Sequence, residues 1–95
     1  MLSENEIPTE YKLKPATPNP FNPVTTISYD LPKNSHVRLV IYDILGREIR
    51  KLVDGYKEKG SHSAHFDGTN LSSGVYIILF EAGDYTRSSK IMLVK

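Results

Sequence analysis

The most continuous apolar stretch of the chain extends from Val75 to Phe80 and follows a Ser-Ser-Gly turn. A run this short and this rich in β-branched residues predicts a strand buried on both faces, because a membrane-spanning helix needs about 20 apolar residues. Burial of each large apolar side chain contributes about 1.5–3 kcal/mol. We therefore expect this strand to lie at the centre of the fold and to continue to about Ala82.

Elsewhere, apolar and polar residues alternate with a period of two, which predicts strands with one buried face. In residues 25–31, for example, the buried face would carry Ile27, Tyr29 and Leu31. The complete set of predicted strands is 11–13, 25–31, 37–42, 47–53, 61–66, 75–82 and 85–94.

Turn-forming residues separate the predicted strands. Gly46 closes a tight turn in which it can take a positive φ, and residues 83–84 predict a hairpin turn. A polar loop is expected over residues 54–60, which begin with Asp54-Gly55 and end with Lys59-Gly60. Ile49 and Leu52 fall out of the period-two alternation, which predicts a bulge or a strong twist between them.

Residues 15–23, hereafter the proline segment, contain four prolines. Proline fixes φ and lacks a backbone N–H, so this segment can be neither a helix nor a central strand. It predicts an extended, polyproline-like crossing with turns at its Asn-Pro steps. Phe21 is its one large apolar residue, and we expect its ring to fix the crossing to the core.

Residues 1–10 are polar and acidic and predict a linker or frayed tail, which leaves residues 11–95 as one domain. About seven strands, with no helical periodicity, predict an all-β fold: an immunoglobulin-like antiparallel β-sandwich with Greek-key connections. No apolar run has transmembrane length, and residues 1–6 lack the basic and apolar regions of a signal peptide. An exported form of this domain would therefore be a piece of a longer precursor.

Composition removes several classes of function. The net charge of +1 and the scattered basic residues argue against binding to nucleic acid or to an anionic membrane. The absence of cysteine excludes disulfides, thiolate zinc sites and a cysteine nucleophile. His62 and His65 are three residues apart on a predicted strand, so they point to opposite faces and cannot share a metal ion. We expect neither a metal nor a cofactor.

Catalytic chemistry is not expected either. The sequence around Ser73 lacks a nucleophile elbow, and no acid–base pair is evident. Four aspartates fall in turns, where this side chain usually caps backbone N–H groups, although calcium in these loops stays open; they are Asp43, Asp54, Asp67 and Asp84. Five tyrosines could instead line a sugar-binding face; they are Tyr29, Tyr42, Tyr56, Tyr76 and Tyr85.

The order of several short motifs is more informative than any one of them. A Pro-Asn-Pro-Phe-Asn-Pro sequence is followed by a Tyr-Asp-x-x-Gly-Arg turn, a Phe-Asp-Gly sequence and a Ser-Gly-Val-Tyr sequence. Their residues are Pro18, Asn19, Pro20, Phe21, Asn22, Pro23, Tyr42, Asp43, Gly46, Phe66, Asp67, Gly68, Gly74, Val75 and Tyr76. In this order, over residues 11–95, they resemble the C-terminal sorting domain of type IX secretion cargo (the Por secretion system C-terminal domain, type A) of Bacteroidetes-like bacteria.

The resemblance implies a non-catalytic signal that directs a larger, N-terminal cargo domain across the outer membrane. Its implied partners are an outer-membrane shuttle, the translocon and a gingipain-like sortase that removes the domain and can anchor the cargo. The implied location is the periplasm in transit, and then the outer-membrane surface or the medium. The alternative is an immunoglobulin-like binding or spacer module, either carbohydrate-binding or similar to flagellar hook-capping domains.

The resemblance also places the recognition signal at the end of the last strand, in residues Lys90, Ile91, Met92, Leu93, Val94 and Lys95. Alternate residues of this segment are predicted to face opposite sides. A terminal strand can fray, or can offer its free edge to a partner strand, without interrupting the domain. Both properties suit a recognition element.

Overall fold

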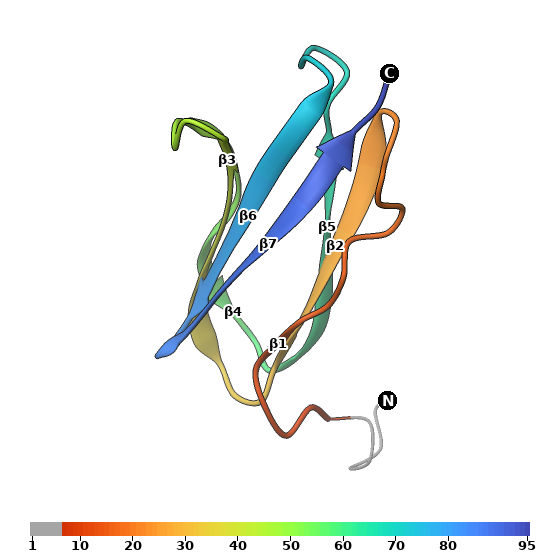
Figure 1. The fold of residues 1–95 in the computed structure, drawn as a ribbon. Coiled ribbons are helices and arrows are strands. Elements are labelled where there is room, and N and C mark those ends of the chain that lie inside the picture. Colours follow the sequence, from red (N-terminus) through yellow and green to blue (C-terminus); the bar gives the residue numbers. More distant parts are fainter. Residues whose placement is uncertain (1–6) are drawn as a thin grey trace.

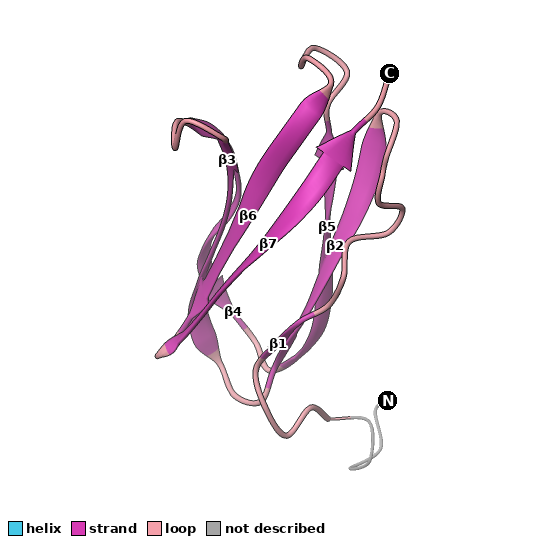
Figure 2. Cartoon of the chain, in the orientation of Figure 1, coloured by secondary structure: helices cyan, strands magenta, loops and turns pink. Residues whose placement is uncertain are grey.

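A computed structural model describes residues 7–95, and the first six residues of the predicted 1–10 linker lie outside the described part. Residues 7–95 form seven strands and no helix (Figures 1 and 2). The strands are β1 (Lys12–Leu13), β2 (Val24–Leu31), β3 (Ser35–Asp43), β4 (Glu48–Lys57), β5 (Gly60–Asp67), β6 (Gly74–Ala82) and β7 (Tyr85–Leu93). Within this range no helix is long and apolar enough to cross a membrane.

The strands form two sheets that face each other (Figure 1). One sheet has the order β1-β2-β5 and the other has the order β4-β3-β6-β7, and all neighbouring strands are antiparallel. The chain passes from one sheet to the other after β2, after β4 and after β5. This is an immunoglobulin-like Greek-key sandwich, so the predicted fold is confirmed.

The core lies between the two sheets and is built from the predicted alternation. Ile27, Tyr29 and Leu31 of β2 are at most 1% exposed, and Val37, Leu39 and Ile41 of β3 are fully buried. The Tyr29 ring packs against Phe80 of the opposite sheet, with ring centroids 5.0 Å apart. Such an aromatic pair contributes about 0.5–1.5 kcal/mol beyond the area it buries.

Strand β6 lies between β3 and β7, which confirms its central position. The predicted burial on both faces is wrong. Its inward residues, such as Ile78 and Phe80, are buried, whereas the outward residues Val75, Ile77 and Leu79 are only half-buried. Among residues 7–95 no second layer covers the outer face of this sheet, so those side chains are shielded only by their neighbours on the same face.

Strand β4 is longer than its sequence predicts. Asp54 and Gly55, expected to begin a loop, continue the strand to Lys57 because the first half of β3 provides a full set of pairing partners. The predicted irregularity is confirmed, since the β3–β4 register skips Ile49 and Leu52. Pairing with a neighbouring strand therefore overrides the turn preference of an Asp-Gly pair.

The connection from β5 to β6 is closed by a tyrosine corner, a hydrogen bond typical of immunoglobulin-like sandwiches. The Tyr76 hydroxyl near the start of β6 donates to the carbonyl oxygen of Ser72 at 2.6 Å. Tyr76 is 7% exposed, and its ring packs edge-on against Phe66. The Ser-Gly-Val-Tyr motif thus fixes the position at which β6 begins.

We expect Tyr76→Phe to lower the free energy of unfolding by about 1 kcal/mol, because the change removes this hydrogen bond and leaves the Ser72 carbonyl without its partner. Urea denaturation of the purified domain measures the loss. Tyr56→Phe is the matched control, since the Tyr56 side chain is 75% exposed. Equal stability of the two variants would contradict the structural role of the corner.

Candidate recognition site

The candidate site is the end of β7, where the sequence places the recognition residues. Strand β7 forms one edge of the four-stranded sheet and pairs with β6 through Gly74–Leu93 and Val75–Met92. The strand ends at Leu93, one residue before the predicted end. The C-terminus lies at the same end of the sandwich as the start of β2 and the β5–β6 connection (Figure 1).

The predicted alternation of this segment is confirmed. Ile91 and Leu93 point into the core and are 2% and 0% exposed. Lys90, Met92 and Val94 are exposed, the two apolar ones at 43% and 48%. The last strand therefore has one face that holds the core together and one face that presents side chains to solvent.

The free edge expected for β7 is not available over residues 90–94, because the proline segment runs along it. The N–H of Phe21 donates to the Met92 carbonyl at 2.9 Å, and the N–H of Val94 donates to the Phe21 carbonyl at 3.0 Å. These two bonds form a parallel bridge between Phe21 and Leu93. The Phe21 side chain is 2% exposed and lies 5.7 Å from the Phe66 ring, so its predicted role in fixing the crossing is confirmed.

Asn19 completes this cover in a way that the sequence did not indicate. Its side-chain nitrogen donates to the Lys90 carbonyl at 3.2 Å, and its side-chain oxygen accepts from the Met92 N–H at 3.0 Å. The Asn19 amide thus pairs with β7 as a peptide group of a neighbouring strand would. The Lys90 carbonyl, both backbone groups of Met92 and the Val94 N–H, which a partner strand would use, are thus bonded within the domain.

The proline segment is held to the other sheet as well. The hydroxyl of the fully buried Thr25 donates to the Pro18 carbonyl at 2.7 Å, and the Gly68 N–H donates to the Pro23 carbonyl at 2.8 Å. A Cβ atom on Gly68 would lie 2.9 Å from Cδ2 of Leu93. The glycine of the Phe-Asp-Gly motif therefore leaves the space that the Leu93 side chain occupies, and a larger residue would have to displace it.

The final residue is bonded to the β5–β6 connection. The Lys95 N–H donates to the Ser73 hydroxyl at 3.0 Å, and the Lys95 ammonium donates to the Thr69 carbonyl. Hydrogen bonds from Thr69, helped by the charges of Arg50 and Lys95, lower the pKa of Asp67. Asp67 is thus a turn-capping aspartate, as predicted.

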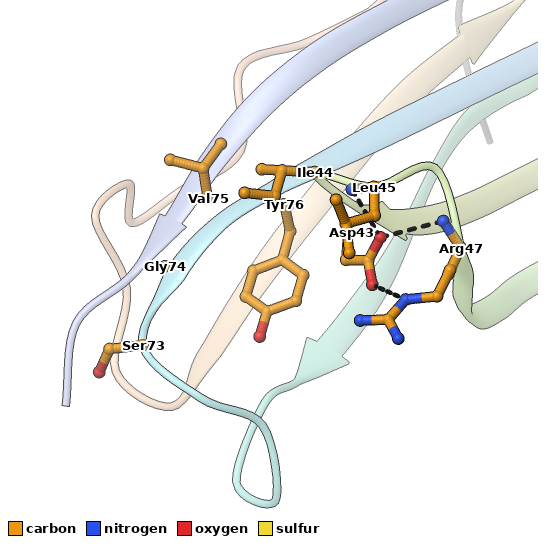
Figure 3. Close-up of a pocket in the computed structure, with 8 residues that line it drawn as sticks. All are labelled: Asp43, Ile44, Leu45, Arg47, Ser73, Gly74, Val75 and Tyr76. Atoms are coloured by element: carbon orange, nitrogen blue, oxygen red, sulfur yellow. Dashed lines mark hydrogen bonds and ion pairs between the residues drawn. The ribbon is translucent and has the colours of Figure 1, made fainter.

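The β3–β4 turn lies beside the start of β6 and forms a pocket of about 310 Å³, the turn pocket (Figure 3). It is lined by Asp43, Ile44, Leu45, Arg47, Ser73, Gly74, Val75 and Tyr76. One Asp43 oxygen accepts from the N–H groups of Leu45 and Arg47, each at 2.9 Å, and the other accepts from the Arg47 guanidinium at 2.7 Å. Gly46 has a φ of 81°, as its position in this turn predicts.

These contacts lower the pKa of Asp43, chiefly through the backbone N–H of Arg47 and then through the Arg47 side chain and the Leu45 N–H. The carboxylate therefore stabilises the turn when it is ionised. The two apolar side chains of the turn remain outside, since Ile44 is 72% and Leu45 is 73% exposed.

A second shallow pocket, of about 320 Å³, lies on the other side of Val75. This edge pocket is lined by Asn19, Pro20, Val75, Lys90, Ile91 and Met92. Val75 lines both pockets, so apolar groups of the proline segment, β6, β7 and the β3–β4 turn meet at one end of the outer face.

The other candidate residues are not gathered into a site. His62 is half-buried, stacks on Tyr29 and bonds to the Glu58 carbonyl, whereas His65 faces solvent and bonds to Thr26. Residues 7–95 contain no group of three or more side chains that could hold a metal ion. The tyrosines do not share a face: Tyr29 and Tyr76 are in the core, while Tyr56 is exposed.

We expect Asn19→Ala to speed hydrogen exchange at the Met92 amide and to lower the free energy of unfolding by about 1 kcal/mol, since two hydrogen bonds to the β7 edge are lost. Native-state hydrogen exchange by NMR measures the first effect and urea denaturation the second. Asn70→Ala is the matched control, because Asn70 is exposed in a turn. Unchanged exchange at Met92 would show that Asn19 does not seal the edge.

The Asp43 turn should make stability depend on pH. The folded-state pKa lies below the unfolded value, so the stabilisation is complete above about pH 4 and is lost as pH falls through the folded-state pKa. Asp43→Asn keeps an oxygen acceptor but removes the charge, so we expect it to be less stable than the unsubstituted chain at pH 6. The difference should shrink toward pH 2. Urea denaturation at several pH values tests this, and a difference independent of pH would contradict it.

Comparison with known families agrees with the motif order. The family model described as a secretion system C-terminal sorting domain matches residues 16–95, which include the proline segment from its second residue, both pockets and the last strand. No curated protein and no solved structure matches the chain. Because the family match covers most of the chain, this protein belongs to the C-terminal sorting domains of type IX secretion.

Proposed function

We propose that this domain directs a larger N-terminal cargo through the type IX pathway and that residues 90–95 form the part recognised by the export machinery. Membership of the family supports the general role, which is export across the outer membrane toward the surface or the medium. The more specific elements are proposals: transit through the periplasm, binding to an outer-membrane shuttle and the translocon, and removal by a gingipain-like sortase with surface anchoring.

The observation that carries this assignment is the double role of the last strand. Ile91 and Leu93 fix it in the core, Asn19 and Phe21 bond the backbone at its end, and Ser73 bonds the backbone N–H of Lys95 just after it. The exposed side chains of the strand are thus held in fixed positions. A rigid scaffold that holds a few exposed side chains suits a non-catalytic recognition signal, and we propose that the domain carries no catalysis of its own.

Cleavage by a sortase is proposed within residues 1–14, before the proline segment. Thr9 and Glu10 are exposed, and β1 begins only at Lys12. A cut ahead of β1 would leave every strand of the sandwich intact. The released domain could then keep its fold after the cargo has separated.

A reporter with a signal peptide tests the proposal when this chain is fused to its C-terminus and expressed in a type IX-competent host. We expect the reporter at the cell surface or in the medium, and we expect deletion of residues 91–95 to retain it in the periplasm. Protease accessibility of whole cells and fractionation measure the two locations. A reporter without the domain is the control.

Two outcomes would contradict the proposal: retention of the complete fusion in the periplasm, or surface delivery that survives the deletion. The deletion also removes Ile91 and Leu93 from the core, so its effect combines loss of signal with loss of stability. Substitutions that leave the core unchanged are needed to separate the two.

A further inference from the structure

The route by which a partner contacts β7 is restricted by the proline segment. Strand addition needs unpaired backbone groups at a sheet edge. Here the Lys90 carbonyl, both backbone groups of Met92 and the Val94 N–H are bonded to Asn19 or Phe21. A partner that meets the folded domain therefore contacts side chains at this end, and not the backbone edge.

Several apolar side chains available there line the two pockets, which share Val75. Met92 lines the edge pocket and is 43% exposed, whereas Ile44 and Leu45 line the turn pocket and are 72% and 73% exposed. Val75 lines both pockets. Exposed large apolar residues that gather around pockets mark interaction sites, whereas singly scattered ones do not. Figure 3 shows Ile44, Leu45 and Val75 on the same side of the turn pocket.

The charges around this surface are unequal. The Arg47 guanidinium is paired with Asp43 at 2.7 Å, so the turn pocket is internally neutralised. Lys90 is exposed, lines the edge pocket and makes no ion pair with any residue of the described range 7–95. An occupant that complements the edge pocket would supply an apolar group for Val75 and Met92 and a carboxylate for Lys90.

We infer that the edge pocket and the turn pocket together are the docking surface for a protein of the export machinery, which packs apolar side chains on either side of Val75 and sets a carboxylate against Lys90. The inference rests on the proposed function and specifies how the signal is recognised. A protein is favoured over an anionic membrane because the surface has one uncompensated lysine, and the chain has a net charge of only +1. A polybasic patch would be needed for stable attraction to lipid.

Substitutions on the outward face test the inference without touching the core. In the reporter fusion, Lys90→Glu, Met92→Gln and Leu45→Ser should each reduce surface delivery, and we expect the Lys90→Glu, Met92→Gln double variant to reduce it about tenfold or more. Lys90→Arg keeps the positive charge and should export nearly as well as the unsubstituted chain. Thermal melting of each 95-residue variant establishes that it folds.

Matched controls come from the far end of the same sheet. Tyr56 and Lys57 pair with the first residues of β3, at the opposite end of the strand from the β3–β4 turn. Both are exposed. Tyr56→Ser and Lys57→Glu repeat the loss of an apolar group and the reversal of a charge, and we expect full surface delivery for both.

The outcomes separate the inference from the proposed function. If folded Lys90→Glu and Met92→Gln variants are exported normally while the 91–95 deletion is not, the sorting role stands and the docking surface is wrong. If the unsubstituted fusion is never exported, the proposed function fails. If the domain floats with vesicles of phosphatidylglycerol and lipopolysaccharide, and flotation depends on Lys90, the surface binds a membrane and the inferred protein partner is wrong. If analytical ultracentrifugation shows a dimer that Met92→Gln disrupts, the surface binds a second copy of this chain and the inferred partner is again wrong.

Discussion

The pairing between the proline segment and the end of β7 is the interaction on which the organisation of this domain depends. An edge strand with free backbone groups invites association with other strands, and proteins usually cover or interrupt such edges. Here the cover is a segment that proline makes unsuitable as a regular strand. Asn19 supplies through its side chain the donor and acceptor that a regular strand would supply through a peptide group.

The short motifs of the sequence meet at one end of the sandwich for related reasons. Phe21 enters the core beside Phe66, and Gly68 lets the chain pass close to Leu93. Tyr76 fixes the start of β6, which in turn sets the register of β7. Motifs far apart in the sequence are thus parts of one structural arrangement, and its result is the fixed position of the last strand.

Much of the fold could be predicted because apolar residues at every second position, such as Ile27, Tyr29 and Leu31, identify the buried faces of the strands. The full extent of β4 could not, since Asp54 and Gly55 follow the pairing offered by β3 and not their own turn preference. The half-exposed outer face of β6 was also missed, because a run of apolar residues does not reveal whether a second layer covers the sheet. The tyrosine corner had a signal, namely a tyrosine two residues into a strand that follows a crossing turn.

Of the candidate site, the sequence indicated the segment and its two faces but not what surrounds them. The Asn19 side chain contacts Lys90 and Met92, which lie 71 and 73 positions later in the sequence. No periodicity in the sequence encodes such a contact. The two pockets likewise arise where the β3–β4 turn, the proline segment and two strands come together, which only the register of the sheet determines.

Asn19 and Lys90 are far apart in the sequence, so the edge pocket that they line can form only in a completely synthesised and folded domain. The edge pocket has one wall from the start of the domain and another from its last strand, 71 residues later. Neither wall forms the pocket alone, and the register of the strands between them brings the two together. The edge pocket forms only after the domain has been synthesised through its last strand and has folded, so a truncated or misfolded precursor would lack this pocket.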